Sequence, residues 1–203
     1  MLDDKLIKKM NEFLDVIESS KGPAVMVTLP GKDSKAYSSG FNLMAILAKK
    51  HNKVLIPMEM IDLYCRILTL NVPTLAVITG HCIAGGVFLA QCHDRVIMTT
   101  NPKFKMQLNE STAGIGMFSV YLTLLKEVLS PRTARTLILG GVVRSKEALE
   151  LDLVQGLFEN HEELKAQVCT FRDLRGPLAK NERFRFNLQN SKRSLWKFLL
   201  KSV

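Results

Sequence analysis

Residues 74–98 read TLAVITGHCIAGGVFLAQCHDRVIM. The apolar run 74–80 has the length and composition of a buried strand, and it ends on a glycine. A glycine pair, Gly85 and Gly86, then opens directly into a helical pattern, and residues 95–100 again have the pattern of a strand. A strand, a glycine-centred loop, a helix and a further strand in this order predict an α/β fold.

The rest of the chain alternates in the same way. An amphipathic helix is expected over 2–20, a short strand over 24–30 and a polar loop over 31–40. Helical patterns follow from about Asn42, over 56–70, over 118–129, over 132–139 with Pro131 in its first turn, and after a cap at Ser145.

Two glycine-centred loops each follow a strand. The first reads SSGFNL (38–43), and the second reads GHCIAGG (80–86). Glycines at the junction of a strand and a helix leave backbone N–H groups without partners, and the helix dipole adds positive potential there. Two such N–H groups converging on one oxygen would form an oxyanion hole. Ordinary tight turns use the same residue types and are the alternative for each loop.

The order of three segments gives these loops a context. SSGFNL is followed by the segment 71–98, which begins NVP, and then by FKMQLNESTAGIG at 104–116. Together they resemble the enoyl-CoA hydratase/isomerase (crotonase) family from about residue 12 to residue 158.

The resemblance implies a crotonase-like ββα spiral core over 1–160 and a basic helical C-terminal region over 161–203 that mediates trimer formation. Members of the family normally begin with a pair of strands ahead of the first helix. Here the first helix begins almost at Met1, so we expect these first strands to be missing. Because an open sheet edge needs cover, we expect a partner, another subunit or a further segment to supply it.

The resemblance also implies roles for individual residues. In the family, two backbone N–H groups hold a thioester carbonyl, and their positions match Phe41 and Gly85. Hydratases of the family use two acids; Phe88 stands at the position of the first, and Glu110 at the position of the second. A single carboxylate suits a 1,3-proton shift better than the addition of water, and an apolar Phe88 would raise the pKa of Glu110. Without the resemblance, Glu110 would be interpreted as an exposed carboxylate at a strand end.

The phrase LNEST (108–112) is most similar to the mitochondrial Δ3,Δ2-enoyl-CoA isomerases of the family. The expected reaction is therefore conversion of 3-enoyl-CoA to trans-2-enoyl-CoA, with Glu110 as the catalytic base and a hydratase-like activity as an alternative. Residues expected to contact the substrate are Lys35, Ser39, Phe88 and Met117. Neither a metal nor a redox cofactor is implied, since CoA arrives as part of the substrate.

Other reactive residue types receive structural interpretations. Asp94 is expected to act as a cap or an ion-pair partner, and His81 and His93 are expected to pack in the core or a loop. The four cysteines lack the CxxC spacing of redox or zinc motifs, so buried free thiols are expected.

The net charge of +9 is concentrated at the end of the chain. Residues 165–203 hold ten Lys or Arg against two acids, which gives +8 for this segment. A solvated helical face would explain it, and so would a docking surface for phosphates or an acidic partner protein. Nucleic-acid binding is not favoured, because the aromatic residues in this segment fit helix packing better than base stacking.

Two further classes of function remain beside the enzyme. The chain could be a catalytically weak structural subunit of a larger assembly, or it could bind RNA through its basic end. Residues 1–20 carry acids too early for a transit peptide, the final KSV does not match a peroxisomal SKL address, and no apolar run is long enough to span a membrane. The resemblance favours a mitochondrion, with a peroxisome as the alternative.

Overall fold

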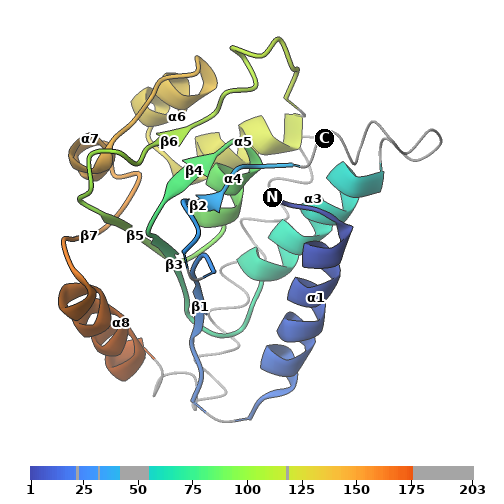
Figure 1. Cartoon of the computed structure of the whole chain (residues 1–203). Helices are drawn as coiled ribbons and strands as arrows, with labels where there is room; N and C mark the ends of the chain where they lie inside the picture. Colours follow the sequence, from blue (N-terminus) through green and yellow to red (C-terminus); the bar gives the residue numbers. More distant parts are fainter. Residues whose placement is uncertain (22, 32, 42–54, 118, 176–203) are drawn as a thin grey trace.

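The computed structural model describes residues 1–21, 23–31, 33–41, 55–117 and 119–175 (Figure 1). In chain order, the elements are α1 (Asp4–Ser19), β1 (Met26–Thr28), β2 (Ala36–Ser38), α3 (Leu55–Leu68), β3 (Thr74–Ile78), β4 (His81–Ile83), α4 (Gly85–Gln91), β5 (Arg95–Thr99), β6 (Met106–Gln107), α5 (Ser119–Val128), α6 (Pro131–Ile138), α7 (Ser145–Glu150), β7 (Leu157–Phe158) and α8 (His161–Arg175).

The strands form two parallel sheets. The larger has the order β1-β3-β5-β7, and the smaller has the order β2-β4-β6. Successive strands of the chain therefore enter the two sheets in turn, and parallel neighbours are connected through helices such as α3 and α4. This arrangement confirms the predicted α/β class. In the described part of the chain no strand precedes α1, and β1 forms one edge of the larger sheet.

Apolar side chains pack on both faces of the larger sheet. The main core cluster joins α1, α3, α4 and α5 to inward-facing strand residues such as Ala76 and Met98. A smaller cluster on the other face brings Phe171 of α8 against Leu75, Ile97 and Phe158. Figure 1 shows α8 on the opposite side of the strands from α1 and α3. The C-terminal region is thus helical as far as Arg175, and its remainder lies outside the described residues.

Local sequence signals explain α1 and its contact with α3. The Asp3 side chain accepts a hydrogen bond from the Leu6 N–H at 2.9 Å, which caps the helix. Ile7, Leu14 and Ile17 are buried on one face at helical spacing. Arg66 of α3 binds Asp15 and Glu18 of α1 at 2.7 and 2.9 Å, a contact that aligns the two helices at their surface.

Most predicted elements are confirmed, with shifts of a few residues at their ends. The predicted polar loop 31–40 is wrong in part, because β2 lies within it, and β4 lies within the predicted glycine loop 80–86. Ser145 does not cap α7; it is the first residue of that helix, and Arg144 occupies the N-cap position. The helix predicted from Asn42 falls outside the described residues.

Asp94 has the structural role expected of it. Its carboxylate accepts hydrogen bonds from the Thr74 N–H at 2.8 Å and from the Thr74 hydroxyl at 2.9 Å, while that hydroxyl accepts from the Asp94 N–H. These hydrogen bonds connect the start of β3 to the turn before β5. The four cysteines are free thiols, and burial raises the pKa of Cys65 to about 12.

Replacing Asp94 with Ala is expected to lower the free energy of unfolding by about 1–3 kcal/mol, because the fully buried Thr74 loses its charged acceptor. Chemical denaturation of the variant measures this change, with Glu12→Ala on the exposed face of α1 as the control. Unfolding free energies equal for the two variants would contradict the structural role of Asp94.

Candidate active site

Two loops meet where the smaller sheet joins α4. β2 leads into Gly40, which has a φ of +80°, and β4 leads into Ala84, which has a φ of +53°. A Cβ atom added to Gly40 would lie 3.1 Å from the Gly85 nitrogen, and one added to Gly86 would lie 2.7 Å from the Ser38 Cβ. Glycine is therefore required at both positions, because the two loops approach each other too closely for a side chain. The structure thus brings together the two loops that were predicted from the sequence to form a site.

Two backbone donors lie beside the close approach of these loops. The Phe41 N–H follows Gly40 directly, and the Gly85 N–H belongs to the first turn of α4. Neither group donates a hydrogen bond within the described residues. These two groups are therefore the candidate donors for the oxyanion hole that the family resemblance implies.

Two residues outside the loops, Tyr64 and Leu2, hold the loops in place. The Tyr64 hydroxyl of α3 donates to the Gly85 carbonyl oxygen at 2.7 Å. The Leu2 N–H donates to the Gly40 carbonyl oxygen at 2.8 Å, and its buried side chain lies against the α-carbon of Gly85. Sequence analysis missed both residues. The one available signal was a tyrosine on the apolar face of a helix, since a buried phenol usually needs a hydrogen-bond partner.

Glu110 lies on the turn that follows β6. Its carbonyl oxygen accepts hydrogen bonds from the Ile115 N–H at 2.9 Å and the Ala113 N–H at 3.1 Å, which fix the turn. Its Oε2 atom is buried and has no hydrogen-bond partner in the described part of the chain. Burial raises the pKa of the Glu110 carboxyl above its ordinary value, while its own backbone N–H lowers it. A desolvated carboxylate with an unused lone pair is a competent base.

An aromatic cluster occupies the interior between these parts. Phe88 of α4 is only 1% exposed, and its ring stacks on Tyr121 of α5 with centroids 4.7 Å apart. Tyr121 also contacts the rings of Tyr64 and Phe41, at centroid distances of 6.0 and 6.5 Å. Phe88 is thus a core residue that reaches the site through Tyr121, a residue that sequence analysis did not single out.

The other residues predicted to contact the substrate lie nearer the surface. Ser39 is exposed beside Gly40, and Met117 is partly buried against the main core cluster. The Lys35 side chain is exposed, while its carbonyl oxygen accepts a hydrogen bond from the His81 N–H at 3.0 Å. His81 packs edge-on against Phe104, and the His93 ring binds Thr28 and the Leu89 carbonyl, so both histidines have the packing roles expected of them.

A groove begins beside the first loop and runs between α1 and the strands β1 and β2. Its volume is about 580 Å³, within the usual range for a small-molecule site. Ser38 and Ser39 lie at one end, and Lys9 contributes a cation. The apolar part of its lining comes from Met10, Phe13, Val27 and Leu29, among others.

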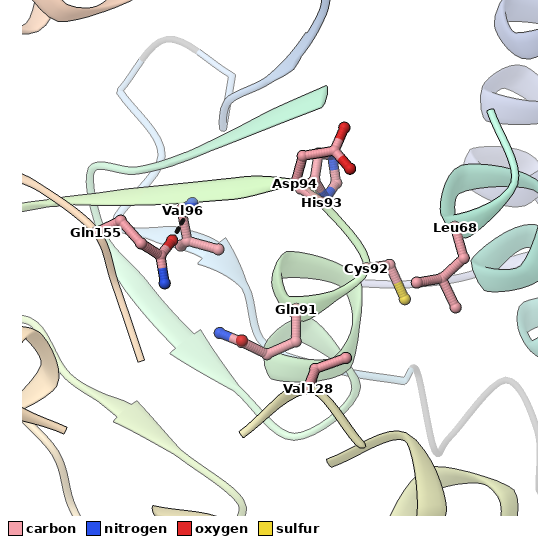
Figure 2. Close-up of a pocket in the computed structure, with 8 residues that line it drawn as sticks. All are labelled: Leu68, Gln91, Cys92, His93, Asp94, Val96, Val128 and Gln155. Carbon is pink, nitrogen blue, oxygen red and sulfur yellow. Dashed lines mark hydrogen bonds between the residues drawn. The ribbon is translucent and has the colours of Figure 1, made fainter. Parts of the chain in front are cut away.

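A second cavity of about 240 Å³ lies at the other end of α4 (Figure 2). Its polar side chains already have protein partners. Gln91 donates to the Leu153 carbonyl at 3.0 Å, and Gln155 accepts from the Val96 N–H at 2.9 Å. Because this cavity lies at the opposite end of α4 from Gly85 and its polar groups are satisfied, we do not assign it to the active site.

The described residues contain no group of three His, Cys, Asp or Glu side chains that could hold a metal ion. Among the helices described, none is long and apolar enough to cross a membrane.

Comparison with known proteins identifies the fold family. The profile of the enoyl-CoA hydratase/isomerase family matches residues 1–179. The chain belongs to this family. This match confirms the family resemblance found in the sequence.

Curated relatives within the enoyl-CoA hydratase/isomerase family include isomerases. Enoyl-CoA delta isomerase 1, mitochondrial, of Mus musculus is 35% identical over 94 residues, covering 46% of this chain and 32% of that protein. Enoyl-CoA delta isomerase 2, peroxisomal, of Arabidopsis thaliana is 27% identical over 154 residues, covering 72% of this chain and 62% of that protein. The chain thus spans less than two thirds of the length of these relatives.

Solved structures of the family show the same fold. Human mitochondrial delta3-delta2-enoyl-CoA isomerase matches with a TM-score of 0.82 at 21% identity, over 98% of this chain and 75% of that chain. Enoyl-CoA hydratase from Bacillus halodurans matches with a TM-score of 0.81 at 22% identity, over 99% and 82%. Because an isomerase and a hydratase match equally well, the backbone establishes the fold and leaves the reaction to be argued from the side chains.

Proposed function

We propose that the protein is a Δ3,Δ2-enoyl-CoA isomerase that uses Glu110 as its single acid–base residue. The observation that carries this proposal is the state of the half-buried Glu110 carboxylate, whose buried Oε2 atom has no hydrogen-bond partner in the described structure. The first of the two positions at which a hydratase of the family has an acid is occupied here by the buried Phe88.

The reaction needs one proton transfer out of the substrate and one back into it. Ionised Glu110 takes a proton from C2 of a 3-enoyl-CoA, the double bond moves from C3–C4 to C2–C3, and the protonated acid returns the proton to C4. The intermediate carries negative charge on the thioester oxygen. In the proposed arrangement, the Phe41 and Gly85 N–H groups bind that oxygen, and each such donor contributes about 3 kcal/mol to the transition state.

Phe88 favours isomerisation over hydration in this proposal. Hydration by the family's usual route needs a second carboxylate to position water, and a phenylalanine cannot supply one. The stack of Phe88 on Tyr121 also fills this part of the core with apolar rings. We further propose that Ser39 and Lys35 contact the CoA part of the substrate. The groove at Ser39 would accommodate its entry. Met117 and Phe88 are proposed to line the site of the acyl part.

The proposed setting of the reaction is fatty-acid oxidation in a mitochondrion, with a peroxisome as the alternative. We propose a homotrimer or a larger assembly, with no cofactor beyond the CoA of the substrate. An acidic protein is the proposed partner of the basic C-terminal region. Nucleic acid is not proposed as a ligand.

A structural subunit without activity is the second candidate. It is favoured by β1, which forms an edge of the larger sheet in the described structure, and by the fraction of the curated relatives that the chain spans. The Glu110 side chain opposes it, because a buried carboxylate oxygen without a hydrogen-bond partner is costly to keep in a purely structural role.

Purified protein is expected to convert 3-hexenoyl-CoA to 2-hexenoyl-CoA, and to hydrate 2-hexenoyl-CoA at least about 100-fold more slowly, since the second acid of the hydration route is absent. Ultraviolet absorbance of the conjugated thioester follows both reactions. Comparable rates would favour the hydratase, and no turnover by folded protein would favour the structural subunit.

A further inference from the structure

The backbone on the N-terminal side of α4 is strained. Ala84, the residue before the helix, has a φ of +53° and a ψ of −129°, a combination that residues with a side chain rarely adopt. The peptide bond from Ala84 to Gly85 carries the Gly85 N–H, which is one of the two proposed donors to the thioester oxygen. Because a strained backbone persists only where the surrounding structure holds it, the contacts around Gly85 determine the direction of this donor.

Backbone hydrogen bonds hold the loop side of this peptide. The Ala84 N–H donates to the Gln107 carbonyl oxygen at 2.9 Å, and the Ala84 carbonyl oxygen accepts from the Val87 N–H at 2.8 Å. Both bonds act on Ala84. A peptide plane that is held on one side can still rotate about the neighbouring single bonds, so the direction of the Gly85 N–H depends also on what holds the other side of Gly85.

Tyr64 of α3 holds that other side. Its hydroxyl donates to the Gly85 carbonyl oxygen at 2.7 Å, and the side chain is only 3% exposed. The space around the Gly85 α-carbon is also closed. A Cβ atom added there would lie 3.2 Å from the Leu2 Cδ1 atom, 3.3 Å from the Tyr64 hydroxyl oxygen and 3.4 Å from the Phe41 Cε2 atom. Gly85 is therefore held by a hydrogen bond and enclosed by three side chains.

The Tyr64 hydroxyl is a permanent donor in this contact. Burial raises the pKa of the Tyr64 phenol well above its ordinary value, so the group keeps its proton throughout the pH range of an enzyme assay. A carbonyl oxygen can only accept, and the hydrogen bond therefore has one direction. Its position on the far side of the Gly85 α-carbon means that it restrains the direction of the Gly85 N–H without changing the strength of that donor.

We propose that Tyr64 is a positioning residue, whose hydrogen bond to the Gly85 carbonyl keeps the Gly85 N–H directed at the thioester oxygen of the substrate. This inference rests on the proposed function. Tyr64 is not placed in contact with the reacting atoms, and its effect passes through Gly85. A donor that is fixed before the substrate arrives stabilises the developing charge without any reorganisation of the site.

A buried tyrosine that only satisfies its own hydroxyl is the alternative. In that case the bond to Gly85 would contribute to the stability of the fold, and its loss would leave a bound thioester unchanged. The two interpretations therefore differ in what happens to the substrate carbonyl when the hydroxyl is removed from a folded protein.

Tyr64→Phe is expected to lower kcat about ten- to hundredfold, because the Gly85 donor is no longer held in the direction of the oxygen. The KM for 3-hexenoyl-CoA should change less than about threefold, since the proposed contacts to CoA remain. Phenylalanine keeps the ring that meets Tyr121 edge-on at a centroid distance of 6.0 Å, so the packing of α3 against α5 is preserved.

Thr133→Val is the matched control. The Thr133 side chain is fully buried in α6, and its hydroxyl also donates to a backbone carbonyl at 2.7 Å, that of Leu151. Its loss should lower the melting temperature by a few degrees, as expected for Tyr64→Phe, and leave kcat unchanged.

Infrared spectra of bound hexanoyl-CoA test the inference without any need for turnover. This thioester has no double bond to move, and an isotope label at its carbonyl carbon separates its stretching band from those of the protein. Donors that bind the oxygen shift the band to lower frequency. The full shift is expected in the wild type and in Thr133→Val, and a smaller shift in Tyr64→Phe. If Tyr64→Phe does not fold, Tyr64→p-aminophenylalanine keeps a weaker donor of the same shape and should give an intermediate shift.

Each outcome decides the inference. A folded Tyr64→Phe protein with the wild-type band and the wild-type kcat would overturn it, and so would a loss of kcat with an unchanged band, because Tyr64 would then act elsewhere. A wild type that does not shift the band would overturn it as well, since there would be no donor to direct. If the wild type shifts the band and Tyr64→Phe weakens this shift, but neither protein isomerises 3-hexenoyl-CoA, the proposed function fails while the role of Tyr64 stands.

Discussion

Glu110→Gln is expected to reduce isomerisation by about a thousandfold or more, since the proposed mechanism passes both proton transfers through this one side chain. Glutamine has nearly the same shape as glutamate but cannot accept the C2 proton at neutral pH. The site contains no second acid that could replace it at the position of Phe88. Initial rates with 3-hexenoyl-CoA measure the loss, and Glu127→Gln on the exposed face of α5 makes the same chemical change away from the site.

The stability of Glu110→Gln shows whether a lost activity reflects chemistry or unfolding. Burial raises the folded-state pKa of Glu110 above its unfolded value, so the folded chain holds the proton more tightly. The free energy of unfolding therefore falls as the pH rises from the ordinary carboxyl range through the raised pKa, and the ionised group costs stability at neutral pH. Removing the charge should leave the melting temperature unchanged or higher. A well-folded variant with wild-type activity would eliminate Glu110 as the base.

The same raised pKa sets the expected pH dependence of the wild type. Only the ionised carboxylate can act as the base, so kcat/KM should fall as the pH is lowered through the pKa of Glu110. This acid limb should lie above the range typical of an exposed glutamate, because burial has moved the titration upward. If the acid limb of the kcat/KM profile disappeared in Glu127→Gln, the wrong carboxylate would have been assigned as the base.

The elements with strong hydrophobic patterns were predictable from the sequence. The five residues of β3 are all buried and form a continuous apolar run, and α1 carries both a cap at Asp3 and a regular apolar face. Such patterns depend on neighbours in the chain, which the sequence contains. Gly40, Gly85 and Glu110 were assigned to the proposed site through the family resemblance, which spans long stretches of the chain.

Short strands and long-range contacts were not predictable in this way. β2 and β4 have three residues each, too few for a periodic pattern, and they are defined by pairing with each other and with β6. The stack between Phe88 and Tyr121 joins two helices, and nothing in either local sequence specifies it. The aromatic cluster around Tyr121 therefore became visible only in three dimensions.

Gly40→Ala is expected to lower kcat about 100-fold or more, because the loop that presents the proposed Phe41 donor cannot keep its geometry. The new Cβ would lie 2.6 Å from the Ala84 Cβ and 3.1 Å from the Gly85 nitrogen, so the substitution pushes apart the two loops that would bind one oxygen. A φ of +80° is also unfavourable for alanine and adds about 1 kcal/mol or more of strain. The change thus affects both proposed donors without removing any functional side chain.

Gly31→Ala is the matched control for Gly40→Ala. Gly31 lines the groove, but a Cβ there meets no atom within 4 Å, so this variant should keep its kcat and its melting temperature. Measurements of kcat and of thermal unfolding separate the two consequences expected at Gly40. The strain should lower the melting temperature by a few degrees. The displaced donors should lower kcat far more than this loss of stability could lower it. A folded Gly40→Ala protein with wild-type kcat would mean that the substrate oxygen does not lie between these loops. The assignment of Phe41 and Gly85 as donors would then be wrong, even if Glu110 proved essential.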